Sequence, residues 1–205
     1  MDSALPGGNR DVRIDRIDVL SDSWYTLRRV HFDYRNSAGV WHRHQREAYD
    51  RGNGVAILLV DWNRQTVILT RQFRMPAFLN GHSDGMLIEA PAGLLDADDA
   101  ETAIRREAEE ETGYRVSSVE RLFELFMSPG SVTERVAFFA AEYTADDRVS
   151  AGGGVPQEGE DIEVLELELD VALERVRNGE INDGKTVLLL QWAQLRRQER
   201  GAVNE

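Results

Sequence analysis

The sequence predicts an α+β fold, in which a mixed sheet lies between helices. Strand-like and helical segments follow one another without the regular strand–helix–strand alternation that a parallel α/β fold requires. Most of the extended segments come first, an acidic helix interrupts them, and two further helices come last. An additional antiparallel β region is expected before the main domain.

That N-terminal β region is predicted to cover residues 11–51. Apolar side chains at every second position, Val30, Phe32 and Tyr34, favour an extended conformation. The segment Asn36–Gly39 has the composition of a turn. The three predicted strands are Val12–Leu20, Trp24–Tyr34 and Val40–Tyr49.

The main domain is predicted to cover residues 52–197, with flexible tails at residues 1–10 and 198–205. Gly54–Val60 is an apolar run, and the turn Asp61–Arg64 after it is typical of a buried hairpin. The other strands and helices follow from alternation and helical periodicity. The predicted strands are Gly54–Val60, Gln65–Thr70, Leu87–Ala90, Arg121–Met127, Val136–Tyr143 and Ile162–Leu169, and the late helices are Asp170–Asn178 and Thr186–Arg197.

Composition limits the class of protein. Hydrophobic residues make up 41% of the 205 residues and charged residues 30%, which is typical of a globular chain with one domain and an appendage. The lack of cysteine excludes a disulfide framework, a zinc–thiolate site and a thiol nucleophile. No signal pattern or membrane-length apolar run is visible, so we expect a cytoplasmic protein without a membrane partner. The net charge of −13 argues against nucleic acid as a partner.

The acidic helix is predicted to end at Gly113, since glycine readily adopts the left-handed conformation of a helix stop. Asp98 or Asp99 can cap its first turn. Glu101 is placed for a capping box. These signals place the acidic residues between them on one continuous helix.

Two acids of this helix, Glu107 and Glu111, are predicted to face the core. They lie one turn apart, roughly 5–6 Å between Cβ atoms, in the same stripe as Ala103 and Ile104. Two carboxylates against an apolar surface are costly unless a cation lies between them. The alternative is a solvated helix that packs through its opposite face, but that face is too polar to form a core. The residues of the opposite face are Arg105, Glu109 and Thr112.

A metal site is therefore the favoured hypothesis for this helix. Its ligands would be oxygen atoms, and the chain has no cysteine. Oxygen ligands favour a hard cation such as Mg²⁺, which is usually held by one or two carboxylates together with substrate phosphates. Mn²⁺ is a possible substitute.

The same stretch resembles the Nudix box of diphosphate hydrolases, usually written G-x5-E-x7-R-E-U-x-E-E-x-G-U with U apolar. Gly93 opens the pattern, and Arg106–Tyr114 supplies its catalytic half. Asp99 stands in place of the first Glu, and the spacer before Arg106 is one residue short, so Asp99 is not assigned as a ligand. The resemblance implies the Nudix α/β/α sandwich and the hydrolysis of a diphosphate.

The resemblance also implies the roles of the site residues. Glu107, Glu111 and the backbone carbonyl of Ala92 are implied as metal ligands, with Arg106 orienting the acids. An acidic segment that follows Gly152–Gly154 is implied to supply the general base and a further metal ligand. That residue is Glu160 by motif, while Asp161 and Glu163 remain alternatives.

Other segments resemble the Nudix subgroup that hydrolyses GDP-mannose, whose members are dimers. We therefore expect a homodimer formed through the N-terminal β region, with phosphate, base and sugar contacts from both parts of the chain. The similar segments are Asp50–Gly54, Arg71–Arg74, Ala92–Asp96, Leu122–Phe126, Met127–Gly130, Ala151–Val155 and Asp183–Leu190. The implied substrate contacts are Trp24, Tyr25, Gln45, Arg46, Glu47, Arg74, Ala92, Gly93, Glu134 and Lys185.

The predicted activity is Mg²⁺-dependent hydrolysis of a nucleoside diphosphate sugar, with GDP-mannose giving GMP and mannose 1-phosphate. One alternative is the same chemistry on ADP-ribose, giving AMP and ribose 5-phosphate. Another is a non-catalytic module that only binds a nucleotide sugar. The intact acids of the box argue against this last reading, because a binder needs no hydrolytic metal cluster.

Overall fold

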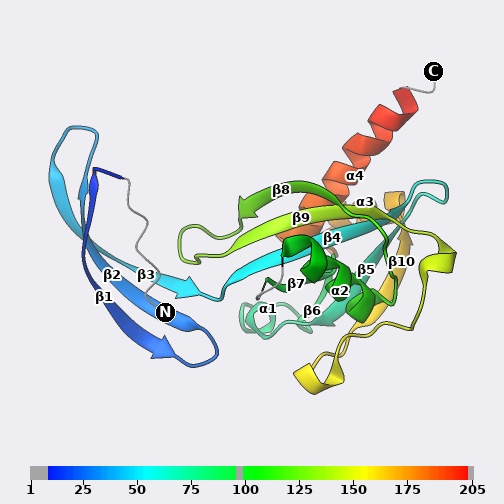
Figure 1. The fold of residues 1–205 in the computed structure, drawn as a ribbon, viewed down its shortest axis with the longest axis horizontal. Coiled ribbons are helices and arrows are strands. Elements are labelled where there is room, and N and C mark those ends of the chain that lie inside the picture. Colours follow the sequence, from blue (N-terminus) through cyan, green and yellow to red (C-terminus); the bar gives the residue numbers. More distant parts are fainter. Residues whose placement is uncertain (1–8, 96–98, 203–205) are drawn as a thin grey trace. The chain divides into compact units, whose positions relative to one another are not determined.

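The computed structural model describes residues 9–95 and 99–202, which divide into two compact units (Figure 1). The N-terminal unit comprises the described residues up to Gly52 together with Ser128–Glu134. The C-terminal unit comprises the described residues of Asn53–Met127 and of 135–205. No helix among the described residues is long and apolar enough to cross a membrane.

The N-terminal unit contains a three-stranded antiparallel sheet in the order β1-β2-β3, drawn in blue in Figure 1. Its strands confirm the predicted antiparallel β region. Trp24 and Tyr25, however, lie in the turn that joins β1 to β2 and not in a strand. The strands are β1 (Val12–Asp22), β2 (Thr26–Arg35) and β3 (Trp41–Asp50).

The segment Ser128–Glu134 adds to the end of β3, although it lies far away in sequence. The N–H of Tyr49 donates to the carbonyl of Ser131 at 2.8 Å, and the N–H of Thr133 donates to the carbonyl of Tyr49 at 3.0 Å. The hydroxyl of Thr133 also donates to Asp50 at 3.1 Å. These bonds satisfy polar backbone groups that an edge strand otherwise leaves unpaired.

The C-terminal unit contains a seven-stranded mixed sheet. Its main path is β10-β5-β4-β9-β8, with β6 paired to β5 and β7 paired to β4. Among the pairings of these described strands, that of β4 with β9 is the parallel one, and β4 pairs antiparallel with β5, as the predicted hairpin requires. The strands are β4 (Asn53–Asp61), β5 (Thr66–Phe73), β6 (Met86–Glu89), β7 (Ala92–Leu95), β8 (Glu120–Phe126), β9 (Arg135–Glu142) and β10 (Glu163–Glu168).

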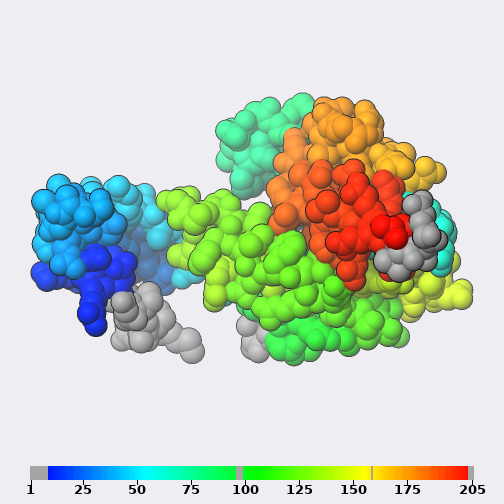
Figure 2. Space-filling model, turned by 90° about the horizontal axis from the view of Figure 1, so that it is seen from above, coloured from blue at the N-terminus to red at the C-terminus, as the bar shows by residue number. Residues whose placement is uncertain are grey.

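Helices cover both faces of this sheet, because β4 is apolar on both sides. Val55, Ile57 and Leu59 belong to the core that α2 (Ala100–Thr112) completes. The intervening side chains of β4 belong to a second core beneath α3 (Leu169–Arg177) and α4 (Gly184–Ala202). The space-filling view shows α3 and α4 side by side, in orange to red (Figure 2). The predicted α+β class, with a mixed sheet between helices, is confirmed.

Three features differ from the sequence-based expectation. The short helix α1 (Met75–Leu79) and the strand β7 were not predicted, because five and four residues are too few to show periodicity. Helix α4 starts at Gly184, earlier than predicted, and continues to Ala202 through part of residues 198–205, which were expected to form a tail.

Candidate active site

The helix α2 begins and ends at the residues that the sequence predicts. Asp99 is the N-cap, and its Oδ1 accepts hydrogen bonds from the N–H groups of Glu101 and Thr102, each at 3.1 Å. The expected capping box does not form through Glu101, since Thr102 is the third residue after this cap and its hydroxyl bonds to Asp99. Gly113 ends the helix with a left-handed φ of 79°. Asp98 lies outside the described residues.

The inward face of α2 carries the two predicted acids. Ala103, Ile104 and Ala108 are fully buried there, Glu111 is 2% exposed, and Glu107 is half-buried. This confirms that the acids face the core. The expectation that Thr112 lies on a face too polar to form a core is wrong, because Thr112 is buried.

Thr112 is fully buried, although its side chain is polar. Its hydroxyl donates to the backbone carbonyl of Ala108, one turn earlier in the helix. A buried hydroxyl that bonds to its own helix costs little, which explains why this position tolerates threonine.

Glu111 is held in an environment that disfavours its charge. Burial raises its pKa to about 8, and the negative charges of Glu107 and Glu160 add to this rise. A hydrogen bond from the N–H of Ala92, at 3.2 Å, and the positive charge of Arg74 oppose it. Residues from four separate segments therefore act on one carboxylate.

Glu107 lies directly against Gly93 in β7. A Cβ atom on Gly93 would be 2.2 Å from Cδ of Glu107 and 2.5 Å from its Oε1. The neighbouring Arg106 lies 3.1 Å from Oε1 of Glu107 and 3.4 Å from Oε2 of Glu110. This arrangement suits the predicted role of Arg106 in orienting the acids.

The loop that carries Glu160 is fastened to the C-terminal end of α2. The N–H of Gly153 donates to the carbonyl of Glu111 at 2.9 Å, and the N–H of Gly154 donates to the carbonyl of Glu110 at 3.0 Å. Glu160 then accepts a hydrogen bond from the N–H of Val155 at 2.8 Å. The glycine run thus satisfies helix-end carbonyls and brings Glu160 close to Glu111.

The two alternatives to Glu160 are placed differently. Asp161 is exposed. Glu163 is in β10, opposite Arg71, with which it forms an ion pair at 3.4 Å. Of the three candidates, Glu160 is the one whose negative charge is among the main causes of the raised pKa of Glu111.

The two predicted phosphate-binding cations of this unit, Arg74 and Lys185, meet at a buried carboxylate. Nε of Arg74 donates to Oε2 of Glu89 at 2.7 Å, and Nζ of Lys185 lies 3.5 Å from Oε1 of Glu89. Lys185 also donates to Asp183 at 2.7 Å. Burial alone would raise the pKa of Asp183, but Lys185 and hydrogen bonds from Thr186 hold it below its usual value.

The acids of α2 fit a divalent cation. Among the described residues, no group of three or more His, Asp or Glu side chains is placed to hold a metal ion by itself. Mg²⁺ does not need one, because waters and substrate phosphates usually complete its shell. The buried Glu111, whose pKa is raised beside two other acids, is the kind of ligand that a cation would stabilise in its charged form.

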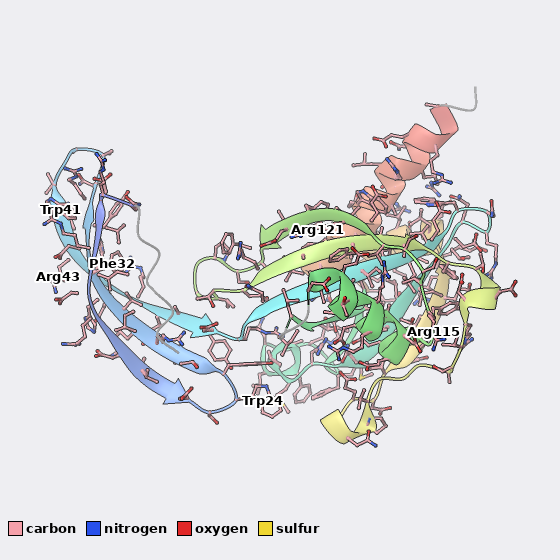
Figure 3. All side chains as sticks on the ribbon, in the orientation of Figure 1. Trp24, Phe32, Trp41, Arg43, Arg115 and Arg121 are labelled. Carbon is pink, nitrogen blue, oxygen red and sulfur yellow. The ribbon has the colours of Figure 1, made fainter. Side chains whose placement is uncertain are left out.

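The remaining predicted contacts belong to the N-terminal unit. Trp24 is 83% exposed at the β1–β2 turn, where Figure 3 labels it, and so it is not a core residue. Its ring meets that of Tyr25 edge-on at 6.3 Å. Arg51 lies over the ring of Tyr25 at 5.6 Å and pairs with Glu134 at 3.5 Å. Trp24, Tyr25 and Glu134 therefore form one cluster.

Three other predicted contacts lie exposed on β3. They are Gln45, Arg46 and Glu47, of which Glu47 pairs with Arg29 across the sheet at 2.8 Å. Because these contacts and the aromatic cluster belong to the other unit, their meeting with the acids of α2 stays a prediction.

Sequence reasoning did not assign roles to Glu89, Asp183 or Arg51. Each contacts a predicted site residue. A glutamate at the end of an apolar strand was the available signal for Glu89, since such a residue is buried only with a partner. Asp183 and Arg51 lie within segments that resemble the GDP-mannose-hydrolysing subgroup, but no sequence pattern indicated which residues they contact.

Comparison with known proteins identifies the family. The NUDIX domain model matches residues 50–184, and the model described as the GDP-mannose pyrophosphatase NudK N-terminal domain matches residues 11–49. The chain belongs to the Nudix family of hydrolases, whose members generally need a divalent cation.

Among its curated relatives is the GDP-mannose pyrophosphatase of Salmonella typhimurium strain LT2. It is 57% identical over 176 residues, which are 86% of this chain and 91% of the relative. The GDP-mannose pyrophosphatase of Salmonella arizonae is 54% identical over 184 residues, or 90% and 95% of the two chains. A crystal structure of an ADP compounds hydrolase shares the fold, with a TM-score of 0.70 at 19% identity over 96% of this chain and 99% of that one.

Proposed function

We propose that the protein hydrolyses GDP-mannose to GMP and mannose 1-phosphate, with Mg²⁺ as cofactor. Curated relatives that are 54–57% identical over most of the chain carry this activity in their names. The structural observation that supports the proposal is the buried carboxylate of Glu111, which lies close to Glu107 and Glu160. A divalent cation would relieve the repulsion within such a group of acids and stabilise their charged forms.

Three groups of this chain would hold the cation: the carboxylates of Glu107 and Glu111 and the backbone carbonyl of Ala92. When bound, Mg²⁺ would neutralise negative charge on the phosphoryl oxygens and lower the pKa of a bound water. Arg106, which lies beside Glu107, keeps the acids oriented.

Glu160 is the general base of the proposed reaction and also a further contact for the cation. It takes a proton from water, whose oxygen forms a bond to one phosphorus while the bridging P–O bond breaks. One water is consumed, and two phosphate monoesters leave. The bond from the N–H of Val155 orients Glu160 for this step.

Arg74 and Lys185 bind the diphosphate. The backbone of β7 at Ala92 and Gly93 provides further contacts with the substrate. Trp24 is proposed to stack on the guanine ring, since it is exposed and aromatic. The other base and sugar contacts proposed are Tyr25, Gln45, Arg46, Glu47 and Glu134. The sheet β1–β3 is proposed to form a homodimer, and the enzyme is proposed to act in the cytoplasm.

Side-by-side assays test this proposal. GDP-mannose, ADP-ribose and other nucleotide sugars are incubated with the protein, with Mg²⁺ or with a chelator, and the products are identified by mass. We expect kcat/KM for GDP-mannose to exceed that for ADP-ribose by about 10-fold or more, with no product in chelator. A preference for ADP-ribose would contradict the proposed substrate, and binding without Mg²⁺-dependent product would indicate a non-catalytic module. The molecular mass of the protein in solution tests the proposed homodimer.

A further inference from the structure

The carboxylate of Glu89 connects three elements of the C-terminal unit. Glu89 is the last residue of β6, Arg74 directly follows β5, and Lys185 is in the first turn of α4. One oxygen of Glu89 bonds to Arg74 at 2.7 Å, and the other lies 3.5 Å from Lys185. Each cation therefore has its own oxygen atom on the same side chain.

Burial differs sharply among these three side chains. The side chain of Glu89 is 4% exposed, whereas that of Arg74 is 40% exposed and that of Lys185 is 22% exposed. The carboxylate thus lies beneath two cations that reach the solvent. A buried carboxylate is costly unless it is paired, and two neighbouring cations repel each other unless an anion lies between them.

The surroundings of Glu89 hold it in place. The hydroxyl of Thr70 donates to the backbone carbonyl of Glu89 at 3.2 Å. The N–H of Ala90 donates to the hydroxyl oxygen of Thr186 at 2.7 Å, and that hydroxyl donates to Asp183 at 2.7 Å. The end of β6 and the start of α4 are therefore bonded to each other, which fixes the backbone on both sides of the carboxylate.

Both cations keep donors for a ligand. The hydrogen bond to Glu89 is donated by Nε–H of Arg74. This bond does not use the terminal Nη groups of Arg74, which can bind phosphate. Lys185 has three N–H donors and contacts two carboxylates, those of Glu89 and Asp183. The charge of Arg74 also acts on Glu111, so this group lies near the acids of α2.

We propose that Glu89 is a positioning residue that holds Arg74 and Lys185 at a fixed separation, so that both contact the diphosphate of the substrate. The inference rests on the proposed function for the identity of that substrate. Glu89 does not touch the ligand and acts only through the two cations. Because they are held before the ligand arrives, less side-chain entropy is lost on binding.

Glu89→Gln tests the proposal, because the amide keeps the shape of the side chain and removes its charge. We expect KM for GDP-mannose to rise about 10-fold, with a smaller change in kcat and an unchanged affinity for Mn²⁺. A purely structural role would instead lower thermal stability and the active fraction without changing KM. An unchanged KM would overturn the proposal.

Glu124→Gln is the matched control. Glu124 also joins two cations, Arg121 at 2.6 Å and Arg135 at 2.8 Å, but it is partly exposed and contacts neither Arg74 nor Lys185. We expect its KM and kcat to stay within about 2-fold of the wild type, since exposed pairs contribute little. An equal rise in KM would show that the effect is not specific to Glu89.

A double-mutant cycle separates positioning from independent roles. If Glu89 acts through Arg74 and Lys185, Glu89→Gln should lower kcat/KM less once Arg74→Ala is present, because only the effect exerted through Lys185 then remains. Multiplicative losses would overturn the proposal. If Glu89→Gln does not fold, a double-mutant cycle of Arg74→Gln with Lys185→Gln serves instead, because both side chains are partly exposed. Multiplicative losses of kcat/KM in that cycle would also count against the proposal.

Calorimetry with inorganic pyrophosphate and Mg²⁺ tests the positioning role of Glu89 separately from the proposed activity on GDP-mannose. We expect Glu89→Gln to weaken pyrophosphate binding about 10-fold relative to the wild type. Unchanged binding would overturn the role of Glu89. A wild-type protein that binds pyrophosphate in this way but leaves GDP-mannose intact would contradict only the proposed function.

Discussion

Gly93 and Glu107 approach so closely that a Cβ atom on the glycine would stand 2.2 Å from Cδ of the glutamate. Real Cβ atoms essentially never approach another heavy atom to less than 3.0 Å. The backbone of Gly93 does not have the left-handed φ that favours glycine. Glycine is therefore required here for space, and the contact places the carboxylate of Glu107 against the backbone of β7 at Gly93.

Gly93→Ala should weaken metal binding while leaving the fold intact. The atoms that the new methyl group meets belong to the flexible side chain of Glu107, so Glu107 can move aside. We expect the affinity for Mn²⁺ to fall about 10-fold and kcat/KM about 100-fold, with thermal stability nearly unchanged. Metal titration and thermal melting measure the two effects. Gly201→Ala is the control, because no atom outside its own stretch of helix lies within 4 Å of its Cβ position, and equal metal affinity in both variants would refute the argument.

Glu111→Gln should remove activity without unfolding the protein. The amide oxygen can still accept the hydrogen bond from the N–H of Ala92, but the charge at the proposed metal site is lost. We expect kcat to fall at least ~100-fold. Steady-state kinetics with saturating Mg²⁺ measure this, and near-wild-type turnover would rule out Glu111 as a ligand.

The stability of the metal-free protein should depend on pH through Glu111. Its pKa is raised from 4.5 to about 8 in the folded state. Between these values the folded chain binds more protons than the unfolded chain, so the free energy of unfolding falls as pH rises from about 4.5 toward 8. The loss is on the order of 5 kcal/mol, because the pKa rises from 4.5 to about 8 and one pKa unit corresponds to about 1.4 kcal/mol.

Denaturant unfolding in chelator, measured across this pH range, checks the prediction. Glu111→Gln should be the more stable protein near pH 8 and should show a flatter pH profile. Mg²⁺ should restore the stability of the wild type there, since the cation favours the charged carboxylate. A wild type that gains stability over this range would contradict the burial argument.

Much of the fold was predictable, because its signals are local. Apolar runs and alternation predicted every strand of the large sheet except β7. The helix α2 was predicted from its cap and its glycine stop. Trp24 and Tyr25 were misplaced because β-prone aromatic residues occur in turns as well, and only the pairing of β1 with β2 decides where the turn lies.

The site was predictable only where the pattern of one helix carries the information. The inward direction of Glu107 and Glu111 follows from helical periodicity, whereas the contacts of Glu89 depend on three elements that meet in the folded chain. Periodicity did not show that Thr112 is buried, since a hydroxyl bonded to its own helix reads as polar. Nothing in the local sequence indicates such tertiary contacts.

Gly154→Ala should disturb the proposed base through a direct clash. A Cβ atom there would lie 2.5 Å from Oε2 of Glu160. Gly159→Ala is a matched control, because Gly159 has the same φ of 79° and no atom beyond its two chain neighbours lies within 4 Å of its Cβ position. Both variants place a side chain at the same positive φ, so a difference between them reports the contacts of the new methyl group with Glu160 and, at 2.9 Å, with Cδ1 of Ile162.

We expect kcat of Gly154→Ala to fall about 10- to 100-fold below that of Gly159→Ala, because general base catalysis contributes about 10²–10⁴-fold and the displaced carboxylate keeps part of it. Glu160→Gln should lose more, whereas Asp161→Asn and Glu163→Gln should stay within about 3-fold of the wild type. Steady-state kinetics measure all five variants under the same conditions. The assignment of the base to Glu160 would be wrong if Glu163→Gln gave the largest loss of kcat. Glu163 would then be the base, and its ion pair with Arg71 would have to open during turnover.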